Sequence, residues 1–365
     1  MKICHLTSVH PHTDTRIFIK ECRSLAMAGY EVHLVAPDAP DSFVDGVNIH
    51  GVKKETGSRL KRMTKTVNRV YEKGLEIDAD VYHFHDLELI PIGIKLKRKG
   101  KKVIYDIHED VPRAIMSKHW INPIIRKFVS LSFEMFENNM AKRFDILVTA
   151  TPFITERFKS INPNTININN YPLLNELIDE QTKKNVNKNN SVCYVGGISD
   201  IRGINEVLEA SKIVNGDIVF AGPVTHDYLK EKMNKLSNVH YLGVLNRSEV
   251  RDLFSRSRAG LVTFLPEPNH INAQPNKMFE YMSAGLPIIC SDFPLWKEII
   301  EKNKCGICVN PRDPKEIAEA INFLLENPEE AQKMGENGRR AVEEKYNWET
   351  ESNKLIQIYN NLLNH

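Results

Sequence analysis

Cysteine, net charge and long apolar runs are all scarce in this 365-residue sequence. The six cysteines are scattered and mostly lie in apolar, strand-like runs, which excludes the disulfide framework of a small secreted domain. A net charge of +2 gives no reason to expect nucleic-acid binding. No run reaches the roughly 18 apolar residues that a membrane-spanning helix needs. The first residues, MKICHLTSVHPHTDTR, do not resemble a signal peptide. We therefore expect a cytoplasmic protein and leave open a position at the inner face of the membrane.

Two nucleotide-binding motifs are also absent. The sequence contains neither the G-x-G-x-x-G fingerprint of dinucleotide-binding folds nor a Walker G-x-x-x-x-G-K-[ST] loop, which disfavours a dehydrogenase or a kinase. Cys305 and Cys308 have the spacing of half a zinc or redox site, but no second pair accompanies them. We interpret the GICV run that contains Cys308 as a buried strand.

Short apolar runs alternate with segments of helical length along the whole chain. This rhythm is typical of parallel sheets covered by helices, so the expected fold class is α/β, with two Rossmann-like domains facing an interdomain cleft. The polar stretch at 172–190 interrupts the rhythm and is the predicted linker. The predicted domains are 1–172, 173–345, and a C-terminal helix over 346–365 that packs back on the first domain.

The segment VGGISDIRG runs from an apolar strand through Gly196 and Gly197 to Arg202. Glycines let backbone N–H groups approach a phosphate, a following helix adds partial positive charge, and an arginine binds two phosphate oxygens at once. A simple tight turn between strand and helix is an equally good interpretation of this segment alone.

A second segment, NAQPNKMFEYMSAGLPIICSD, begins at Asn272. Its spacing predicts a helix that starts near Pro275, which is a favourable position for proline, and that carries Glu280. A carboxylate there is suited to accept two hydrogen bonds from a ribose diol. The alternative is a solvated or capping glutamate.

Together these segments resemble the family 4 retaining glycosyltransferases of the GT-B fold. The opening KICHLTSVHPHTDTR, ADVYHFHD, KVIYDIHED, NNYP and KYNWE also occur where that family has similar segments, so the resemblance covers essentially the whole chain. It implies an enzyme of the hexosyltransferase class that binds a nucleotide-diphosphate sugar, with a UDP-sugar favoured, and that needs no metal or other cofactor.

The resemblance also implies roles for donor-side positions. Glu280 matches the second glutamate of the family's E-x7-E element, whereas Asn272 replaces the first. In the family's G-R-x4-K-G turn, Gly197 replaces the arginine and Arg202 the lysine, so Lys277 is the candidate for the missing cation. The predicted donor-binding residues are Gly196, Gly197, Arg202, Asn272, Gln274, Asn276, Lys277 and Glu280.

On the first domain, His108 matches the family histidine near the reacting carbon. The predicted catalytic residues are His108, Arg202 and Lys277, with no general base, because the resemblance implies that the leaving phosphate helps to deprotonate the acceptor. The predicted acceptor-side residues are Asp14, Thr15, Arg16, His85 and Asp86. Two alternatives stay open: Asp14 as a helix N-cap, and His85-Asp86 as a simple strand-end turn.

The acceptor is expected to be a glycan or a lipid-linked hydroxyl in surface polysaccharide or glycolipid synthesis. Basic runs at 53–73 and 95–102 precede an apolar segment at 114–136, so a peripheral membrane contact through residues 53–136 is one interpretation, and solvated loops with a buried helix are the other. Two other functions remain: a nucleotide-sugar epimerase on the same fold, and a non-catalytic nucleotide-sugar-binding subunit.

Overall fold

A computed structural model describes residues 1–57, 61–118, 120–174, 176–177 and 188–363. The chain divides into two compact units. The N-terminal unit comprises Met1–Asn170 and Trp348–His365, and the C-terminal unit comprises Tyr171–Asn347. Most of the predicted linker at 172–190 lies outside the described residues, and the expected interdomain cleft stays a prediction.

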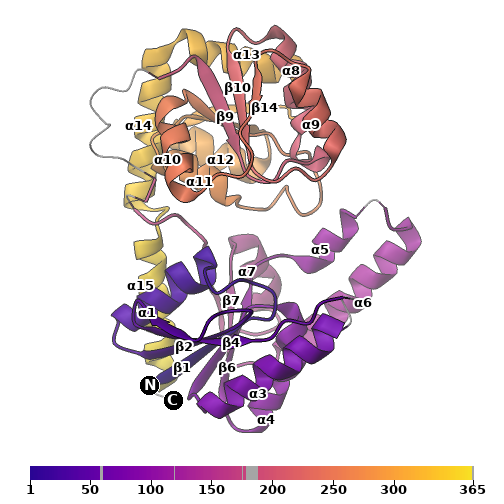
Figure 1. Cartoon of the computed structure of the whole chain (residues 1–365), viewed down its shortest axis with the longest axis vertical. Helices are drawn as coiled ribbons and strands as arrows, with labels where there is room; N and C mark the ends of the chain where they lie inside the picture. The colour runs from indigo at the N-terminus through magenta and orange to yellow at the C-terminus, as the bar shows by residue number, and fades with distance from the viewer. Residues whose placement is uncertain (58–60, 119, 175, 178–187, 364–365) are drawn as a thin grey trace. The chain divides into compact units, whose positions relative to one another are not determined.

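The described residues of the N-terminal unit form an eight-stranded sheet in the order β3-β4-β2-β1-β5-β6-β7-β8 (Figure 1). All neighbouring strands are parallel except β3 and β4. The strands are β1 (Lys2–Leu6), β2 (Glu31–Pro37), β3 (Ser42–Val44), β4 (Val47–Val52), β5 (Val81–Phe84), β6 (Lys102–Ile107), β7 (Ile146–Thr149) and β8 (Thr165–Asn167). The near-continuous apolar sequences of β1, β5, β6 and β7 are almost entirely buried, as a parallel sheet covered on both faces requires, whereas the edge strand β3 is mostly exposed.

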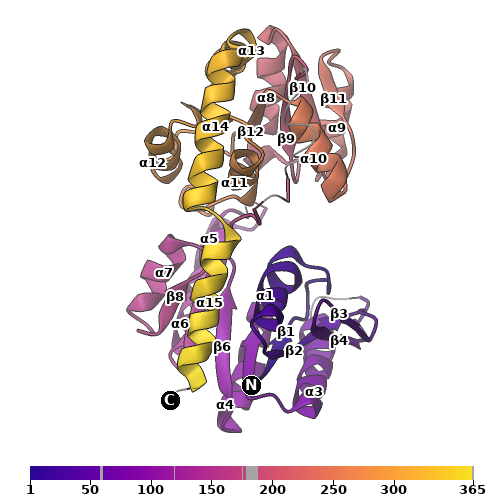
Figure 2. The same cartoon turned by 90° about the vertical axis from the view of Figure 1, so that its left-hand side faces the viewer.

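The helices of this unit include a π-helical segment, η1, directly after the loop that follows β1. They are η1 (Thr15–Cys22), α1 (Arg23–Met27), η2 (Arg62–Thr66), α3 (Val67–Ile77), η3 (Leu87–Leu89), α4 (Ile90–Arg98), α5 (Val111–Met116), α6 (Pro123–Ala141), α7 (Pro152–Lys159) and α15 (Trp348–Leu363). The last of these, α15, lies against η1 and α1 (Figure 2). Trp348 Nε1 donates to Ser24 Oγ at 2.9 Å, and Leu355 and Tyr359 are fully buried.

The described residues of the C-terminal unit form a parallel six-stranded sheet in the order β11-β10-β9-β12-β13-β14. Its strands are β9 (Ser191–Val195), β10 (Asp217–Ala221), β11 (Val239–Tyr241), β12 (Ala259–Val262), β13 (Ile288–Ser291) and β14 (Gly306–Val309). Cys308 lies on β14, and its Sγ is 3.8 Å from Cys290 Sγ on β13.

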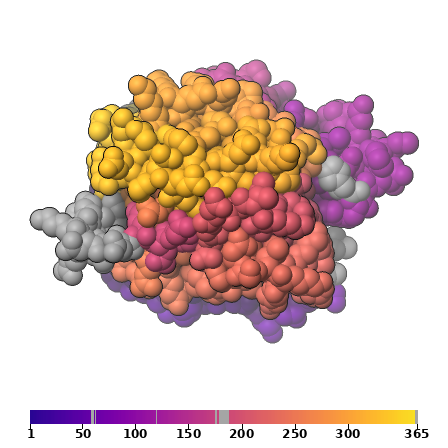
Figure 3. Space-filling view, turned by 90° about the horizontal axis from the view of Figure 1, so that it is seen from above, coloured from indigo at the N-terminus to yellow at the C-terminus, as the bar shows by residue number. Residues whose placement is uncertain are grey.

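The helical segments of this unit are η5 (Asp200–Arg202), α8 (Ile204–Ala210), η6 (Ser211–Ile213), α9 (Asp227–Asn234), α10 (Arg247–Arg256), α11 (Asn276–Ser283), α12 (Pro294–Asn303), α13 (Pro314–Glu326) and α14 (Pro328–Glu344). On the face shown in Figure 3, the orange to yellow residues of α13 lie beside the red residues of α8. The prediction of two Rossmann-like units with parallel sheets is confirmed.

Candidate functional site

In the N-terminal unit, Asp106 lies at the centre of a buried polar cluster. Asp106 is on β6, and it is fully buried. Arg16 donates to both of its carboxylate oxygens, from Nε at 2.9 Å and from Nη2 at 2.8 Å. His108 Nε2 and His85 Nδ1 lie 2.8 and 3.1 Å from its Oδ2. The predicted residues Arg16, His85 and His108 therefore meet at one carboxylate.

Sequence reasoning did not single out Asp106, although it lies two residues before His108 in the quoted segment KVIYDIHED. Burial alone would raise the pKa of its carboxyl, but the Arg16 guanidinium and then His108 hold that pKa well below its usual range. Asp106 is therefore an anion that fixes the orientation of the His108 ring. The His108 side chain is 18% exposed, so part of it reaches the surface.

Arg16 is placed in the interior rather than on the loop surface. Its side chain is 4% exposed, and its Nη1 donates to the Ile168 carbonyl at 3.0 Å. This placement favours a role in holding Asp106 over contact with a diphosphate. The neighbouring Thr15 is exposed, and Asp14 is the N-cap of η1, where its Oδ1 accepts from the Arg16 and Ile17 amides at 2.9 Å each. The alternative left open for Asp14 is thus realised.

Asp86 organises the loop after β1. Its Oδ2 accepts from Thr7 Oγ1 at 2.8 Å and from the Ser8 amide at 2.6 Å. His10 links Asp86 and Asp14, with its Nε2 3.4 Å from Asp86 Oδ1 and its Nδ1 3.3 Å from Asp14 Oδ2. The hydrogen bond to Asp14 raises the pKa of His10. This geometry supports the strand-end interpretation for Asp86, while His85 belongs to the Asp106 cluster.

The same region holds groups with metal-ligand chemistry. Ligand atoms of His5, Glu21, His83 and His85 lie within 4.8 Å of one another. However, the Arg16 guanidinium is 3.1 Å from Glu21 Oε1 and already neutralises Asp106. Burial lowers the pKa of His5, His83 and His85, so these rings are neutral hydrogen-bond partners. We interpret the cluster as a hydrogen-bonded support for His108 because a cation there would lie beside Arg16.

In the C-terminal unit, Gly196 and Gly197 follow β9 and lie directly against two cations. A Cβ on Gly196, whose φ is +130°, would lie 2.9 Å from Lys277 Nζ. A Cβ on Gly197 would lie 3.2 Å from Arg202 Nη1. Arg202 Nη1 also donates to the Gly197 carbonyl at 3.3 Å. The absence of side chains at this turn lets Lys277 and Arg202 approach the same stretch of backbone, as the sequence predicted for a phosphate site.

Helix α11 places Lys277 near this turn, and Tyr281 on the same helix anchors the helix to β9. The two residues are four positions apart and therefore share one face of the helix. Tyr281 Oη accepts the Val195 amide hydrogen at 2.9 Å, at the end of β9. The Tyr281 ring packs on Gly260 of β12, where a Cβ would lie 2.4 Å from it. The contact between Tyr281 and β9 thus places Lys277 over the end of the same strand.

Lys277 is buried, with 8% exposure, and its Nζ lies 3.6 Å from the centroid of the Tyr194 ring. Its Nζ has no hydrogen-bond partner among the residues that the structure describes. Burial, and then the positive charge of Arg202, hold the pKa of Lys277 well below its usual value. A phosphate anion bound at this turn would pair with Arg202 and would favour the charged form of Lys277.

Glu280 forms an ion pair that sequence reasoning missed. Arg247, the first residue of α10, donates to Glu280 Oε1 at 2.9 Å and to Glu176 Oε1 at 2.8 Å. The pair fixes the carboxylate that was predicted to bind a ribose. Nothing local in the segment NRSEV marks this role, because Arg247 is 33 residues from its partner.

The other predicted donor residues lie on the segment that leads into α11. Asn272 and Gln274 are half-buried, whereas Asn276 is exposed at the first position of α11. Gln274 Oε1 is buried without a hydrogen bond to any described residue. Trp296 Nε1 donates to the Ala273 carbonyl at 2.6 Å and holds this segment in place. The structure thus brings the predicted donor residues to one end of α11, and their ligand roles stay predictions.

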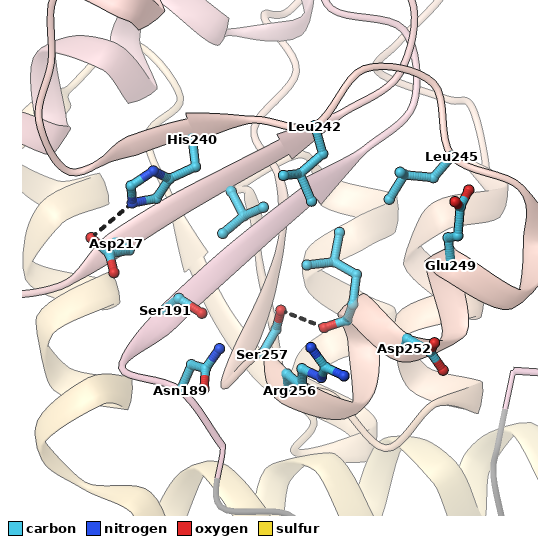
Figure 4. Close-up of a pocket in the computed structure, with 12 residues that line it drawn as sticks. Asn189, Ser191, Asp217, His240, Leu242, Leu245, Glu249, Asp252, Arg256 and Ser257 are labelled. Carbon is cyan, nitrogen blue, oxygen red and sulfur yellow. Dashed lines mark hydrogen bonds and ion pairs between the residues drawn. The ribbon is translucent and has the colours of Figure 1, made fainter.

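A separate pocket of about 430 Å³ lies at the opposite, amino-terminal ends of β9 and β10 (Figure 4). Its lining includes Ser191, Asp217, His240 and Arg256, and none of the predicted site residues. His240 Nε2 is 3.2 Å from Asp217 Oδ1. Because ligands of open parallel sheets bind at the carboxyl ends of the strands, this pocket is not the candidate site.

Two Rossmann-like units, each built on a largely parallel sheet, are the architecture of the GT-B glycosyltransferases. The family model "Glycosyl transferases group 1" matches residues 176–341, and "Glycosyltransferase Family 4" matches residues 16–168. The chain belongs to the family 4 glycosyltransferases and is a glycosyltransferase of GT-B type.

Relatives and solved structures agree with this assignment. The chain is 24% identical to a glycosyltransferase of Methanocaldococcus jannaschii over 98% of each sequence. It is 25% identical to the capsular polysaccharide biosynthesis glycosyltransferase CapM of Staphylococcus aureus, over 64% of this chain and 60% of the relative. Its fold is similar to sucrose-phosphate synthase from Thermosynechococcus elongatus, with a TM-score of 0.77, 18% identity and 99% of each chain covered. Anabaena HepE in complex with UDP gives a TM-score of 0.73 at 15% identity, with 99% of this chain and 100% of that chain covered.

Proposed function

We propose that this enzyme is a retaining glycosyltransferase that moves a sugar from a UDP-sugar to a hydroxyl group of a glycan or lipid-linked acceptor. The observation that carries the proposal is the buried Lys277 ammonium group beside Arg202 at the Gly196-Gly197 turn. Two basic side chains at a glycine turn that ends a parallel strand suit a diphosphate. A diphosphate is the leaving group of every nucleotide-diphosphate sugar.

Transfer breaks the bond between the anomeric carbon and the diphosphate oxygen, so negative charge grows on the phosphate and positive charge on the sugar ring. Lys277 and Arg202 are fixed before the reaction begins, and they stabilise the growing negative charge without reorganisation. In the retaining mechanism, the leaving phosphate accepts the proton of the acceptor hydroxyl while that oxygen bonds to the same face of the sugar. His108, oriented by Asp106, contacts the transferred sugar in this proposal.

The choice of uracil nucleotide rests on structural neighbours. HepE from Anabaena has been solved with UDP and with UDP-glucose. Glu280 would accept both hydroxyl hydrogens of the ribose, with Arg247 holding its carboxylate. The acceptor class rests on relatives such as CapM, whose name places it in capsular polysaccharide biosynthesis.

Thermal unfolding with UDP, GDP and ADP tests the donor site. A ligand that binds the folded state raises its stability by about 2.7 kcal/mol at one hundred times its Kd. We expect UDP to give the largest shift in melting temperature and the Lys277→Met variant to lose it. The surface variant Lys297→Met is the matched control, since Lys297 is 53% exposed. If no nucleotide shifts the wild-type transition, the proposed donor site is wrong.

Assays of UDP release separate transfer from the alternative functions. We expect UDP release from UDP-sugar only when an acceptor extract is present, and a product with retained anomeric configuration by NMR. Because Lys277 and Arg202 supply the positive charge at the phosphate, we propose that transfer continues after treatment with EDTA. Inhibition by EDTA that added Mg²⁺ reverses would contradict a metal-independent mechanism.

A further inference from the structure

Helix α6 is oriented with its apolar side chains toward solvent. Its exposed large hydrophobic residues follow helical spacing in two adjacent rows, and Trp120 precedes them. This apolar face of α6 consists of Trp120, Ile124, Ile125, Phe128, Val129, Leu131, Met135 and Phe136, whose exposure runs from 43% to 81%. A surface helix of a globular protein normally shows the reverse arrangement. Figure 1 shows that the amino-terminal part of α6, with α5, stands out from the sheet of its own unit.

Three polar side chains of α6 face inward and are paired there. Glu137 is fully buried, and it accepts from Arg157 Nη2 at 2.7 Å and from Tyr105 Oη at 3.0 Å. Glu134 accepts from Arg113 at 2.6 Å, and Ser130 Oγ donates to the Pro112 carbonyl at 2.9 Å. These long-range bonds fix the rotation of the helix about its axis. These bonds hold the apolar face toward solvent, and the helix cannot rotate to bury that face without breaking them.

The exposed charge on α6 itself is positive. Lys127 is exposed on α6 beside Phe128, while the two acidic residues of the helix are held inward. Arg126, the residue before Lys127, is half-buried. An apolar face of this size on a monomer marks an interaction site. Exposed aromatic and aliphatic side chains beside lysine and arginine match the interface of an anionic bilayer.

We propose that the apolar face of α6 docks on an anionic lipid bilayer and holds the enzyme at the membrane surface. A second copy is the alternative occupant of this face, and light scattering tests it. No described helix is long and apolar enough to cross a bilayer, so the proposed contact is peripheral. The sequence predicted a membrane contact somewhere within residues 53–136, and the proposal assigns it to α6 and to Trp120 just before it. It does not depend on the identity of the donor.

Trp120 provides a direct readout. Of the three tryptophans, Trp120 is 80% exposed, whereas Trp296 and Trp348 are buried. With the full chain, we expect flotation with vesicles of phosphatidylcholine and phosphatidylglycerol at low salt, together with a blue shift of tryptophan emission. Vesicles of phosphatidylcholine alone should bind at least about tenfold more weakly, and added salt should weaken binding to the anionic vesicles.

Variants test whether vesicle binding depends on the apolar face of α6 or on nonspecific hydrophobic adsorption. Ile124→Gln combined with Phe128→Gln should lower vesicle binding by about tenfold or more, and Lys127→Gln should lower it less. Val244→Gln is the matched control, because Val244 is 71% exposed on the other unit and should not affect binding. The melting-temperature shift with UDP should persist in all of these variants, so failure here is distinguishable from failure of the donor site. Absence of binding to anionic vesicles at low salt, or a dimer in light scattering that the double variant converts to monomer, would overturn the proposal.

Discussion

Lys277 is buried beside Arg202, and its side-chain nitrogen has no hydrogen-bond partner among the described residues, so it costs stability while no anion is bound. We expect Lys277→Met to raise the free energy of unfolding by about 1 to 3 kcal/mol, the usual cost of an unpaired buried polar group. The same variant should lose nucleotide binding. Urea unfolding with and without UDP measures both effects. A variant that is destabilised without UDP would contradict this assignment.

The lowered pKa of Lys277 also predicts proton uptake on binding. Burial and Arg202 lower this pKa in the protein alone, and a diphosphate beside the amine would raise it again. Between these two values binding takes up a proton, so affinity for UDP falls as the pH rises through that range. Calorimetric titrations in buffers of different ionisation enthalpy count the protons. We expect uptake in the wild type and none in Lys277→Met; equal counts would show that another group titrates.

Asp106 contributes stability through its ion pair with the buried Arg16. Because its folded-state pKa is lowered, this contribution is complete above the ordinary carboxyl pKa, about 3.9, and is lost as the pH falls toward the lowered value. Glu21 cannot replace it, since burial and Asp106 raise the pKa of Glu21.

We therefore expect Asp106→Asn to lose about 3 to 5 kcal/mol at neutral pH, the cost of breaking a buried pair. Glu76→Gln breaks the exposed Lys73 pair and should cost less than about 1 kcal/mol. Urea unfolding at several pH values checks both, and the difference between wild type and Asp106→Asn should shrink in acid. A small loss of unfolding free energy at neutral pH would show that the cluster does not depend on Asp106.

At the scale of elements, the turn between η5 and α8 depends on one glycine. Gly203 has φ +72°, and a Cβ there would lie 1.8 Å from the Thr263 carbonyl oxygen. Gly243 has φ +75° with open space around it. Gly243→Ala should therefore cost only the backbone strain, about 1 to 2 kcal/mol, and Gly203→Ala about 1 to 3 kcal/mol more. Gly203→Ala should also weaken UDP binding because it displaces Arg202. Equal costs for the two variants, measured by urea unfolding, would contradict the clash.

Local sequence patterns predicted the strands and most of the residues on the donor side. Apolar runs ending in glycine, histidine or aspartate marked the strands and their carboxyl ends, and the spacing of VGGISDIRG and NAQPNKMFEYMS marked Arg202, Lys277 and Glu280. The roles of Asp106, Arg247 and Tyr281 did not follow, because their contacts with Arg16, Glu280 and Val195 span 33 to 90 residues. A pattern within one segment carries no information about such distant contacts.

The orientation of helix α6 also could not be predicted from its own segment of sequence. Its sequence revealed an apolar segment beside basic runs, and this composition suits a buried helix and a membrane-facing helix equally. The choice is made by Arg157 and Arg113, which bind Glu137 and Glu134 and so turn the apolar residues outward. These two arginines lie on α7 and α5, outside the helix whose orientation they decide.

At the scale of the whole molecule, the two units have separate cores, and α15 completes only the N-terminal one. Tyr359 Oη lies 2.7 Å from His83 Nδ1, and the Asn169 amide donates to Glu351 Oε2 at 2.9 Å. Deletion of residues 348–365 would expose the apolar surface beneath Leu355 and Ile358. UDP, by contrast, is proposed to bind residues of the C-terminal unit alone. Scanning calorimetry should therefore resolve two transitions that respond independently.

We expect UDP to raise the transition of the C-terminal unit and to leave the other nearly unchanged, since a ligand stabilises only the unit that binds it. The deletion should lower the transition of the N-terminal unit by many degrees, because it removes several large buried side chains at about 2 to 5 kcal/mol each. It should preserve the response to UDP. The Lys277→Met variant is the control that identifies the ligand-bound transition. If the deletion abolished the UDP-dependent shift instead, α15 would have to support the donor unit, and the division of the chain at 347 and 348 would be wrong.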